Sequence, residues 1–285
     1  MNQKQKGMFC IVLSAFFFAM MSLFVKLSGD LPSIEKSFFR NLIAMIVASM
    51  ILIKNKQGFS FHKKDLPLLT LRATFGTIGI LANFYAVDHL LLADASILQK
   101  MNPFFVIIFS YFVLNEKISK QQIAMILIAF LGALFVVKPS FQNVQLFASM
   151  IAIVGAAAAG MAYTLVRLLT ERGVEKPKIV FFFSAFSCLV VLPYLFFHYV
   201  PMSWTQFFYL LMAGLMAAGG QFAITSAYSY APGKEISIFD YSQIIFSAIA
   251  GLIVFGQIAD TLSIVGYVII FVIAMINYRY NLKNT

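Results

Sequence analysis

The stretch SAFFFAMMSLFVKL, at residues 14–27, has a counterpart 141 positions later, GAAAAGMAYTLVRL at residues 155–168. The matching pairs within these stretches are Ala15–Ala156, Met20–Met161, Val25–Val166, Lys26–Arg167 and Leu27–Leu168. The same shift, with no gap, also aligns Gly79 with Gly220 and Ser96 with Ser237. Apolar sequences often match by chance, so the constant register is what indicates an internal repeat.

The composition around this repeat is that of a membrane protein. Of the 285 residues, 61% are hydrophobic and 11% are charged, whereas soluble domains keep about a quarter of their residues charged. Apolar runs of about 20 residues, the length that crosses a bilayer as a helix, recur along the chain. Spans are predicted at 7–28, 33–53, 68–88, 91–114, 120–137, 146–170, 177–197, 204–228, 233–256 and 261–279. The apolar residues are continuous rather than alternating, which favours helices over a barrel.

The positive charge is distributed by side of the membrane. With the N-terminus inside, 15 of the 21 Lys and Arg residues fall in the cytoplasm, 3 outside and 3 within spans. This bias follows the positive-inside rule, so both termini are expected in the cytoplasm. The net charge of +10 is therefore a topology signal rather than a nucleic-acid footprint. We expect a multi-pass protein of a cell membrane, surrounded by lipid, acting as a monomer or a homodimer.

The repeat divides the ten spans into two sets of five. Residues 1–139 form the first repeat, residues 146–285 the second, and residues 140–145 the linker. Because five is odd, the second repeat must cross the membrane in the opposite sense. The predicted fold is therefore all-α, with two inverted five-helix repeats. Such repeats are common in secondary transporters, which rock about a central site.

Two segments resemble a known family. NEKIS at residues 115–119 follows Pro103 and closes the fourth span, and FDYSQIIFSAIAGLIVFGQIAD at residues 239–260 is similar to a ninth span. Together with the five-plus-five layout, they resemble the EamA branch of the drug/metabolite transporter superfamily. The family often has Gly-Glu where this chain has Gly256 and Gln257, while Glu116 keeps the acidic residue in the first half. The resemblance implies a cavity lined by spans one to four and six to nine, with spans five and ten peripheral.

Polar residues gather at corresponding places in spans four and nine. Span four carries Ser96, Gln99, Lys100, Asn102 and Pro103, and span nine carries Asp240, Tyr241, Gln243 and Ser247. Spacings of three, four and seven put several members of each set on one helix face, and Pro103 can kink span four beside its cluster. These clusters are predicted to line the cavity. The alternative is that they only hold the helices together by hydrogen bonds.

Charges inside spans are costly and are default functional candidates. At 1.5 Å per residue, Lys100 is roughly 13 Å and Arg40 roughly 10 Å from the outer end of their spans, where no acid matches them. Lys100 would then lose its charge or meet an anionic ligand, which suggests a substrate with a carboxylate. Arg40 could instead bond backbone carbonyls, and Arg72 could pair with Asp240. Asp240 is a candidate for proton coupling, although a fixed ion pair is an equal alternative.

The remaining candidates share faces of spans three, six and eight. The run GAAAAG at residues 155–160 is predicted to be a small-residue packing surface. Tyr163, one turn further, could face substrate. The full set of residues predicted to bind substrate is Arg40, Asn83, Ser96, Gln99, Lys100, Asn102, Tyr163, Gln221, Thr225, Tyr228, Asp240, Tyr241 and Gln243.

The most economical function is secondary transport of a small polar metabolite, amino-acid-like or bearing a carboxylate. The alternatives are a membrane-embedded enzyme, a lipid-handling protein or a receptor. No predicted span contains the His of a nucleophile–base pair, and no glycine-rich phosphate loop suggests ATP-driven transport. The three His residues have no metal-ligand spacing. We therefore expect neither enzymatic activity nor a cofactor or metal.

Overall fold

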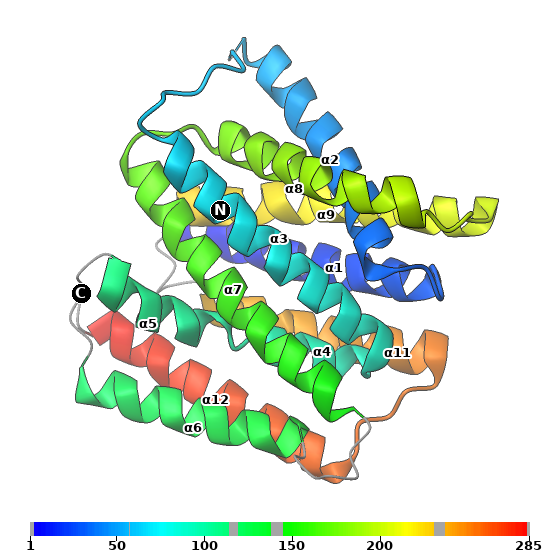
Figure 1. Cartoon of the computed structure of the whole chain (residues 1–285). Helices are drawn as coiled ribbons and strands as arrows, with labels where there is room; N and C mark the ends of the chain where they lie inside the picture. The colour runs from blue at the N-terminus through cyan, green and yellow to red at the C-terminus, as the bar shows by residue number, and fades with distance from the viewer. Residues whose placement is uncertain (1–2, 57, 114–118, 138–144, 231–236, 284–285) are drawn as a thin grey trace.

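The computed structural model describes residues 3–56, 58–113, 119–137, 145–230 and 237–283, and within these all regular structure is helical (Figure 1). The helices of the first half are α1 (Gln3–Leu27), α2 (Ser33–Lys54), α3 (Leu66–His89), α4 (Leu92–Gln99), α5 (Asn102–Val113) and α6 (Lys120–Val137). Those of the second half are α7 (Leu146–Glu171), α8 (Lys176–His198), α9 (Trp204–Tyr230), the 3₁₀ helix η1 (Ser237–Tyr241), α11 (Ser242–Phe255) and α12 (Thr261–Lys283).

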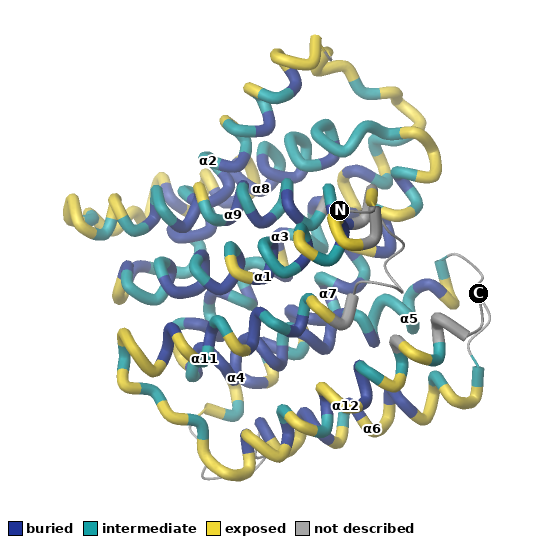
Figure 2. The backbone as a smooth tube through the Cα atoms, turned by 180° about the vertical axis from the view of Figure 1, so that it is seen from behind, coloured by how far each residue is buried: buried dark blue, intermediate teal, exposed yellow. Residues whose placement is uncertain are grey.

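The helices are membrane-spanning in length and composition. Seven described segments are long and apolar enough to cross a bilayer, with α4 and α5 counted as one, and three shorter apolar helices accompany them. Large apolar side chains remain exposed on the outside of the bundle, for example Phe196 and Ile253. Figure 2 shows exposed residues along the outer sides of α6 and α12. In water such exposure would be unfavourable, so these surfaces face lipid. The chain is a multi-pass membrane protein.

The fourth span, predicted over 91–114, is confirmed over Leu92–Val113, but its helix is interrupted. Helix α4 ends at Gln99 and α5 begins at Asn102. Pro103 has no backbone N–H, and its ring conflicts with the carbonyl four residues earlier, which belongs to Gln99. The kink expected beside Pro103 is thus a full interruption. The ninth span opens as η1, and its predicted start at residue 233 lies outside the described residues, as do most of the linker and of the NEKIS motif.

The helices pack in pairs drawn from opposite halves of the chain. The most extensive pairs are α1 with α9, α3 with α7, α2 with α8 and α6 with α12, and α4 also packs against α11. The α6–α12 pair stands apart from the others. This pair lies at one edge of the molecule, where the two helices pack mainly on each other (Figure 1). The expectation that spans five and ten are peripheral is confirmed by these contacts.

Small residues allow the closest of these approaches. A Cβ at Gly155 would lie 2.7 Å from the Cβ of Ala82, and a Cβ at Gly79 would lie 3.4 Å from the carbonyl oxygen of Gly155. The α3–α7 contact therefore leaves no room for a side chain at Gly155. The predicted small-residue packing surface is confirmed here. In the α1–α9 pair, the Ser14 hydroxyl donates a hydrogen bond of 2.9 Å to the carbonyl of Gly220.

Gly256 and Gln257, at the positions where the family often has Gly-Glu, directly follow the end of α11. Gly256 has a φ of 63°, a left-handed conformation that glycine adopts without strain, and its N–H bonds the carbonyl of Leu252. The side-chain oxygen of Gln257 accepts a hydrogen bond of 3.1 Å from the N–H of Leu92, at the start of α4. An amide is enough for this contact, because the acceptor is a carbonyl oxygen.

Candidate functional site

The centre of the bundle holds a buried ion pair. Lys100, just after α4, lies 2.5 Å from a carboxylate oxygen of Asp240 in η1. The two side chains are 5% and 14% exposed. The expectation that Lys100 lacks an acidic partner is therefore wrong. The suggested Arg72–Asp240 bridge is wrong too, because Asp240 pairs with Lys100 and not with Arg72.

Hydrogen bonds join the two interrupted spans around this pair. The Tyr241 hydroxyl donates to the carbonyl of Lys100 at 3.1 Å, a carbonyl that the end of α4 leaves free. The Ser96 hydroxyl donates to the Ser247 hydroxyl at 2.7 Å. Gln243 and Asn102 are buried close by in sequence, on α11 and at the start of α5. Spans four and nine thus meet through the polar faces that the sequence indicated.

Two arginines lie buried on α2 and α3. The side chain of Arg40 donates from Nη1 to the side-chain oxygen of Asn41 at 2.5 Å, and Asn41 in turn donates to the Ser187 hydroxyl of α8 at 2.7 Å. Arg40 therefore meets a side-chain amide rather than the backbone carbonyls considered above. Arg40 and Arg72 are only 2% and 6% exposed.

Arg72 is held by an aromatic ring. Its guanidinium lies 3.9 Å from the centroid of the Phe183 ring on α8, a favourable cation–π arrangement. Gly76, one turn along α3, gives the space for this stack. A Cβ there would lie 2.8 Å from Phe183 and 2.9 Å from Nη1 of Arg72. Arg72 was not among the residues predicted to bind substrate, although a cation inside a span was the available signal.

Tyr163 of α7 is near both the arginines and the central pair. It interacts electrostatically with Arg40, Arg72 and Asp240, which come from α2, α3 and η1. Tyr163 is 37% exposed, so the helices around it cover its side chain only in part.

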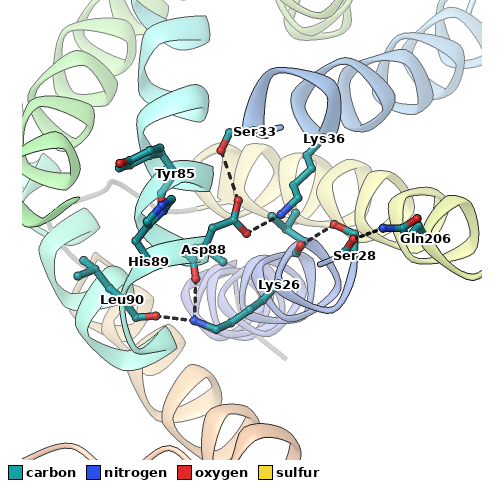
Figure 3. Close-up of polar contacts among 11 residues, drawn as sticks. Lys26, Ser28, Ser33, Lys36, Tyr85, Asp88, His89, Leu90 and Gln206 are labelled. Carbon is teal, nitrogen blue, oxygen red and sulfur yellow. Dashed lines mark hydrogen bonds and ion pairs between the residues drawn. The ribbon is translucent and has the colours of Figure 1, made fainter. Parts of the chain in front are cut away.

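A second charged network closes one end of the bundle (Figure 3). Lys36, fully buried at the start of α2, lies 2.6 Å from Asp88 near the end of α3. Ser33 donates to the other oxygen of Asp88 at 3.3 Å. Lys26 of α1 donates to the carbonyls of Val87 and Leu90 at 2.8 and 2.5 Å. The ends of three helices are thus tied together.

This network was not predicted, because Lys26 and Lys36 are two of the three charges assigned to the outer side of the membrane from the sequence. The available signal was that Lys36 and Asp88 stand just inside the apolar runs of spans two and three, where a charge needs a partner. At the same end, Gln206 of α9 donates to the carbonyl of Ser28 at 3.1 Å, which adds a fourth helix.

The remaining predicted residues are less connected. Asn83, Gln99 and Gln221 are half-buried, and no hydrogen bond joins their side chains to the central pair in the part of the chain that the structure describes. The side chains of Thr225 and Tyr228 lie outside the described residues. Among the described residues there is also no group of three or more His, Cys, Asp or Glu side chains that could hold a metal ion.

A bundle of apolar helices with charged side chains buried at its centre has the architecture of a membrane transporter. A model of the EamA-like transporter family matches residues 5–138. The pseudopaline exporter CntI of Pseudomonas aeruginosa is 33% identical over 271 residues, 94% of each chain. The chain belongs to the EamA family of drug/metabolite transporters. Its relatives are transporters, so it is not an enzyme.

More distant proteins agree with this assignment. Human solute carrier family 35 member G1 is 27% identical over 267 residues, which is 88% of this chain and 73% of the human protein. A solved crystal structure superimposes with a TM-score of 0.67 over 97% of this chain and 98% of the other, at 14% identity. The structural likeness shows the fold.

Proposed function

We propose that this protein is a secondary transporter that moves a small polar metabolite, amino-acid-like or bearing a carboxylate, across the plasma membrane by alternating access. The observation that carries the proposal is the pairing of helices from the two halves around the Lys100–Asp240 ion pair, which follows the 141-residue shift of the sequence. Charge is costly inside a bilayer, so a buried pair at the interface of two halves favours a solute pathway there.

Two glycine contacts support a two-fold relation between the halves. Gly79 packs against Gly155 in the α3–α7 pair. Under the 141-residue shift, Gly79 corresponds to Gly220, and Gly155 corresponds to Ser14. Ser14 and Gly220 are joined by a hydrogen bond in the α1–α9 pair. A relation that exchanges the halves in this way is a two-fold rotation. With five spans in each half, its axis lies in the membrane plane, which is the arrangement of inverted repeats.

The central hydrogen bond supports the same axis. Tyr241 and Lys100, which Tyr241 contacts through its hydroxyl, are equivalent positions under the 141-residue shift. Equivalent residues touch only near a rotation axis, so the axis passes close to this contact. On this basis residues 1–139 and 146–285 are the two repeats that rock about the ion pair.

The Lys36–Asp88 network supports a state closed on one side. The positive-inside rule favours cytoplasmic termini and an extracellular location for the start of α2 and the end of α3. The network then closes the extracellular end. Alternating access requires that the contact between the halves at this end, where Gln206 of α9 donates to the carbonyl of Ser28, breaks when the bundle opens outward.

Proteoliposomes test this function. Liposomes with and without the purified protein are loaded with an equimolar mixture of amino acids, carboxylic acids and their amides, and release is followed by mass spectrometry. We expect one solute or a few to leave faster with the protein present. A pH gradient then distinguishes coupled transport from facilitated diffusion.

The alternatives give different results in the same assay. An enzyme would convert a solute chemically, and a receptor would leave the release of every solute at the level of the protein-free liposomes. Either result, with correctly folded protein in the membrane, contradicts the proposed function.

A further inference from the structure

We propose that Arg40 and Arg72 together bind the anionic group of the solute, a carboxylate or a phosphate, beside Tyr163. This inference rests on the proposed function and names the residues that recognise the substrate. It also moves the anion-binding role away from Lys100, which the sequence alone had suggested.

The charges in this region do not balance. Arg40 and Arg72 are both buried, on neighbouring helices, and they lie close enough to interact electrostatically. No carboxylate lies within ion-pairing distance of either guanidinium among the described residues. Nε of Arg40, and Nε and Nη1 of Arg72, have no hydrogen-bond partner in the same part of the chain. Two uncompensated buried cations are unfavourable unless an anion joins them.

The carboxylates at the centre of the bundle already have partners. Asp240 is paired with Lys100, and at the closed end Asp88 is paired with Lys36. Moving either of these two acids to the arginines would leave a lysine buried without its acid. An external anion compensates both guanidiniums at no such cost.

Both guanidiniums are held in defined orientations. The Phe183 ring packs against one face of the Arg72 guanidinium, and Gly76 has no side chain that would displace either group. Asn41, itself bonded to Ser187, fixes one end of Arg40. A ligand therefore meets oriented donors rather than mobile side chains, which lowers the entropy lost on binding.

Tyr163 provides a third polar group beside the arginines. It interacts electrostatically with both of them, and 37% of its surface is exposed. A guanidinium presents its N–H groups in a planar fork that matches the two oxygens of a carboxylate or phosphate. The tyrosine hydroxyl can add one further donor. Neutral amides lack the charge that two arginines compensate, so they should bind more weakly.

Matched pairs of solutes test the inference. Glutamate and glutamine, and aspartate and asparagine, have similar shapes but differ in charge, and glycerol 3-phosphate with glycerol forms a phosphate pair. For each pair we measure thermal stabilisation of the purified protein and release from the proteoliposomes described above. We expect the anionic member to be favoured in at least one pair, and the identity of that pair distinguishes carboxylate from phosphate.

Three variants assign the preference to residues. Arg40→Met and Arg72→Met should each lower the apparent affinity for the anionic solute by about tenfold, the loss of one charge-assisted contact. Arg72→Lys should keep part of the affinity, because the charge stays and the fork is lost. The control is Arg167→Met, which removes an arginine paired with Glu171 and about half exposed on the same helix as Tyr163.

The outcomes separate the two proposals. Release of neutral and anionic members at equal rates, or an anion preference that survives the Arg40→Met/Arg72→Met double variant, would overturn the inference and leave the transporter function standing. If the protein releases no solute at all, the transporter function is contradicted, and the anion site is then tested by thermal stabilisation alone. If no anion raises the unfolding temperature of the wild-type protein, the anion site is rejected. Without ligand, the Met variants should be at least as stable as wild type, which verifies that they fold.

Discussion

The Lys100–Asp240 pair is the residue-scale feature on which the central region depends. Both side chains are buried, and the pair joins α4 to η1 across the two halves. Breaking a buried pair by removing one partner leaves the other charge uncompensated, at a cost of about 3–5 kcal/mol in soluble proteins. Removing both charges avoids that penalty.

A double-mutant cycle tests this pairing. We expect Lys100→Met and Asp240→Asn each to lower the unfolding temperature more than the double variant Lys100→Met/Asp240→Asn does. Unfolding can be followed with a thiol-reactive dye, because Cys188 is 7% exposed in the folded protein. If the loss in the double variant equals the sum of the losses in the two single variants, a direct interaction is contradicted.

Proton coupling through Asp240 stays a prediction. One oxygen of its carboxylate bonds Lys100, and the other is buried with no hydrogen-bond partner among the described residues. A proton could bind that second oxygen. We expect Asp240→Asn to exchange solute across proteoliposomes but to lose any acceleration by a pH gradient. A gradient that drives Asp240→Asn as strongly as wild type rejects the coupling role.

At the scale of helices, the close approach of α3 and α7 limits what can change. A Cβ at Gly155 would already lie 2.7 Å from Ala82, so Gly155→Val must push the two helices apart. We expect a loss of stability of about 1–3 kcal/mol together with slower solute release. Val154→Ile is the matched control, because it adds one methyl group to an exposed neighbour on the same helix. Equal behaviour of the two variants would show that this contact is unimportant.

The same scale shows how far the sequence predicts the fold. The ends of the continuous spans agree with the helices to within a few residues, because each end is a change from apolar to polar sequence. The interruption after Gln99 was visible only as Pro103, which allows either a kink or a break. Neighbouring helices decide between them, and Tyr241 bonds the freed carbonyl of Lys100.

The site could be predicted less completely. Counting about 1.5 Å per residue placed the backbones of Lys100 and Asp240 at different depths in the membrane, so the two were not expected to pair. A lysine side chain reaches several ångströms from its backbone, which allows the pair to form. The partners of Arg72 depend on Phe183, a residue 111 positions away whose approach needs Gly76. No local pattern in the sequence encodes such a contact. The candidates Lys100, Asp240 and Tyr241 were nevertheless found together, because charge inside a span is informative by itself.

At the scale of the whole molecule, transport depends on movement between the two halves. At one end the halves are joined by Gln206 of α9, which donates to the carbonyl of Ser28 beside the Lys36–Asp88 pair (Figure 3). If the protein works by alternating access, this end must open in every cycle. A permanent connection across it should therefore stop transport without unfolding the protein.

Reversible cross-linking across this end is the most direct test. Ser28→Cys and Gln206→Cys, which stand on opposite halves where Gln206 bonds the carbonyl of Ser28, are combined with Cys10→Ser and Cys188→Ala. The new cysteines are joined by a short bifunctional methanethiosulfonate. Solute release from proteoliposomes is measured before cross-linking, after it, and after reduction. We predict that the cross-linked protein releases no solute and that reduction restores release to the initial rate. Release at the initial rate while the cross-link is intact would contradict alternating access.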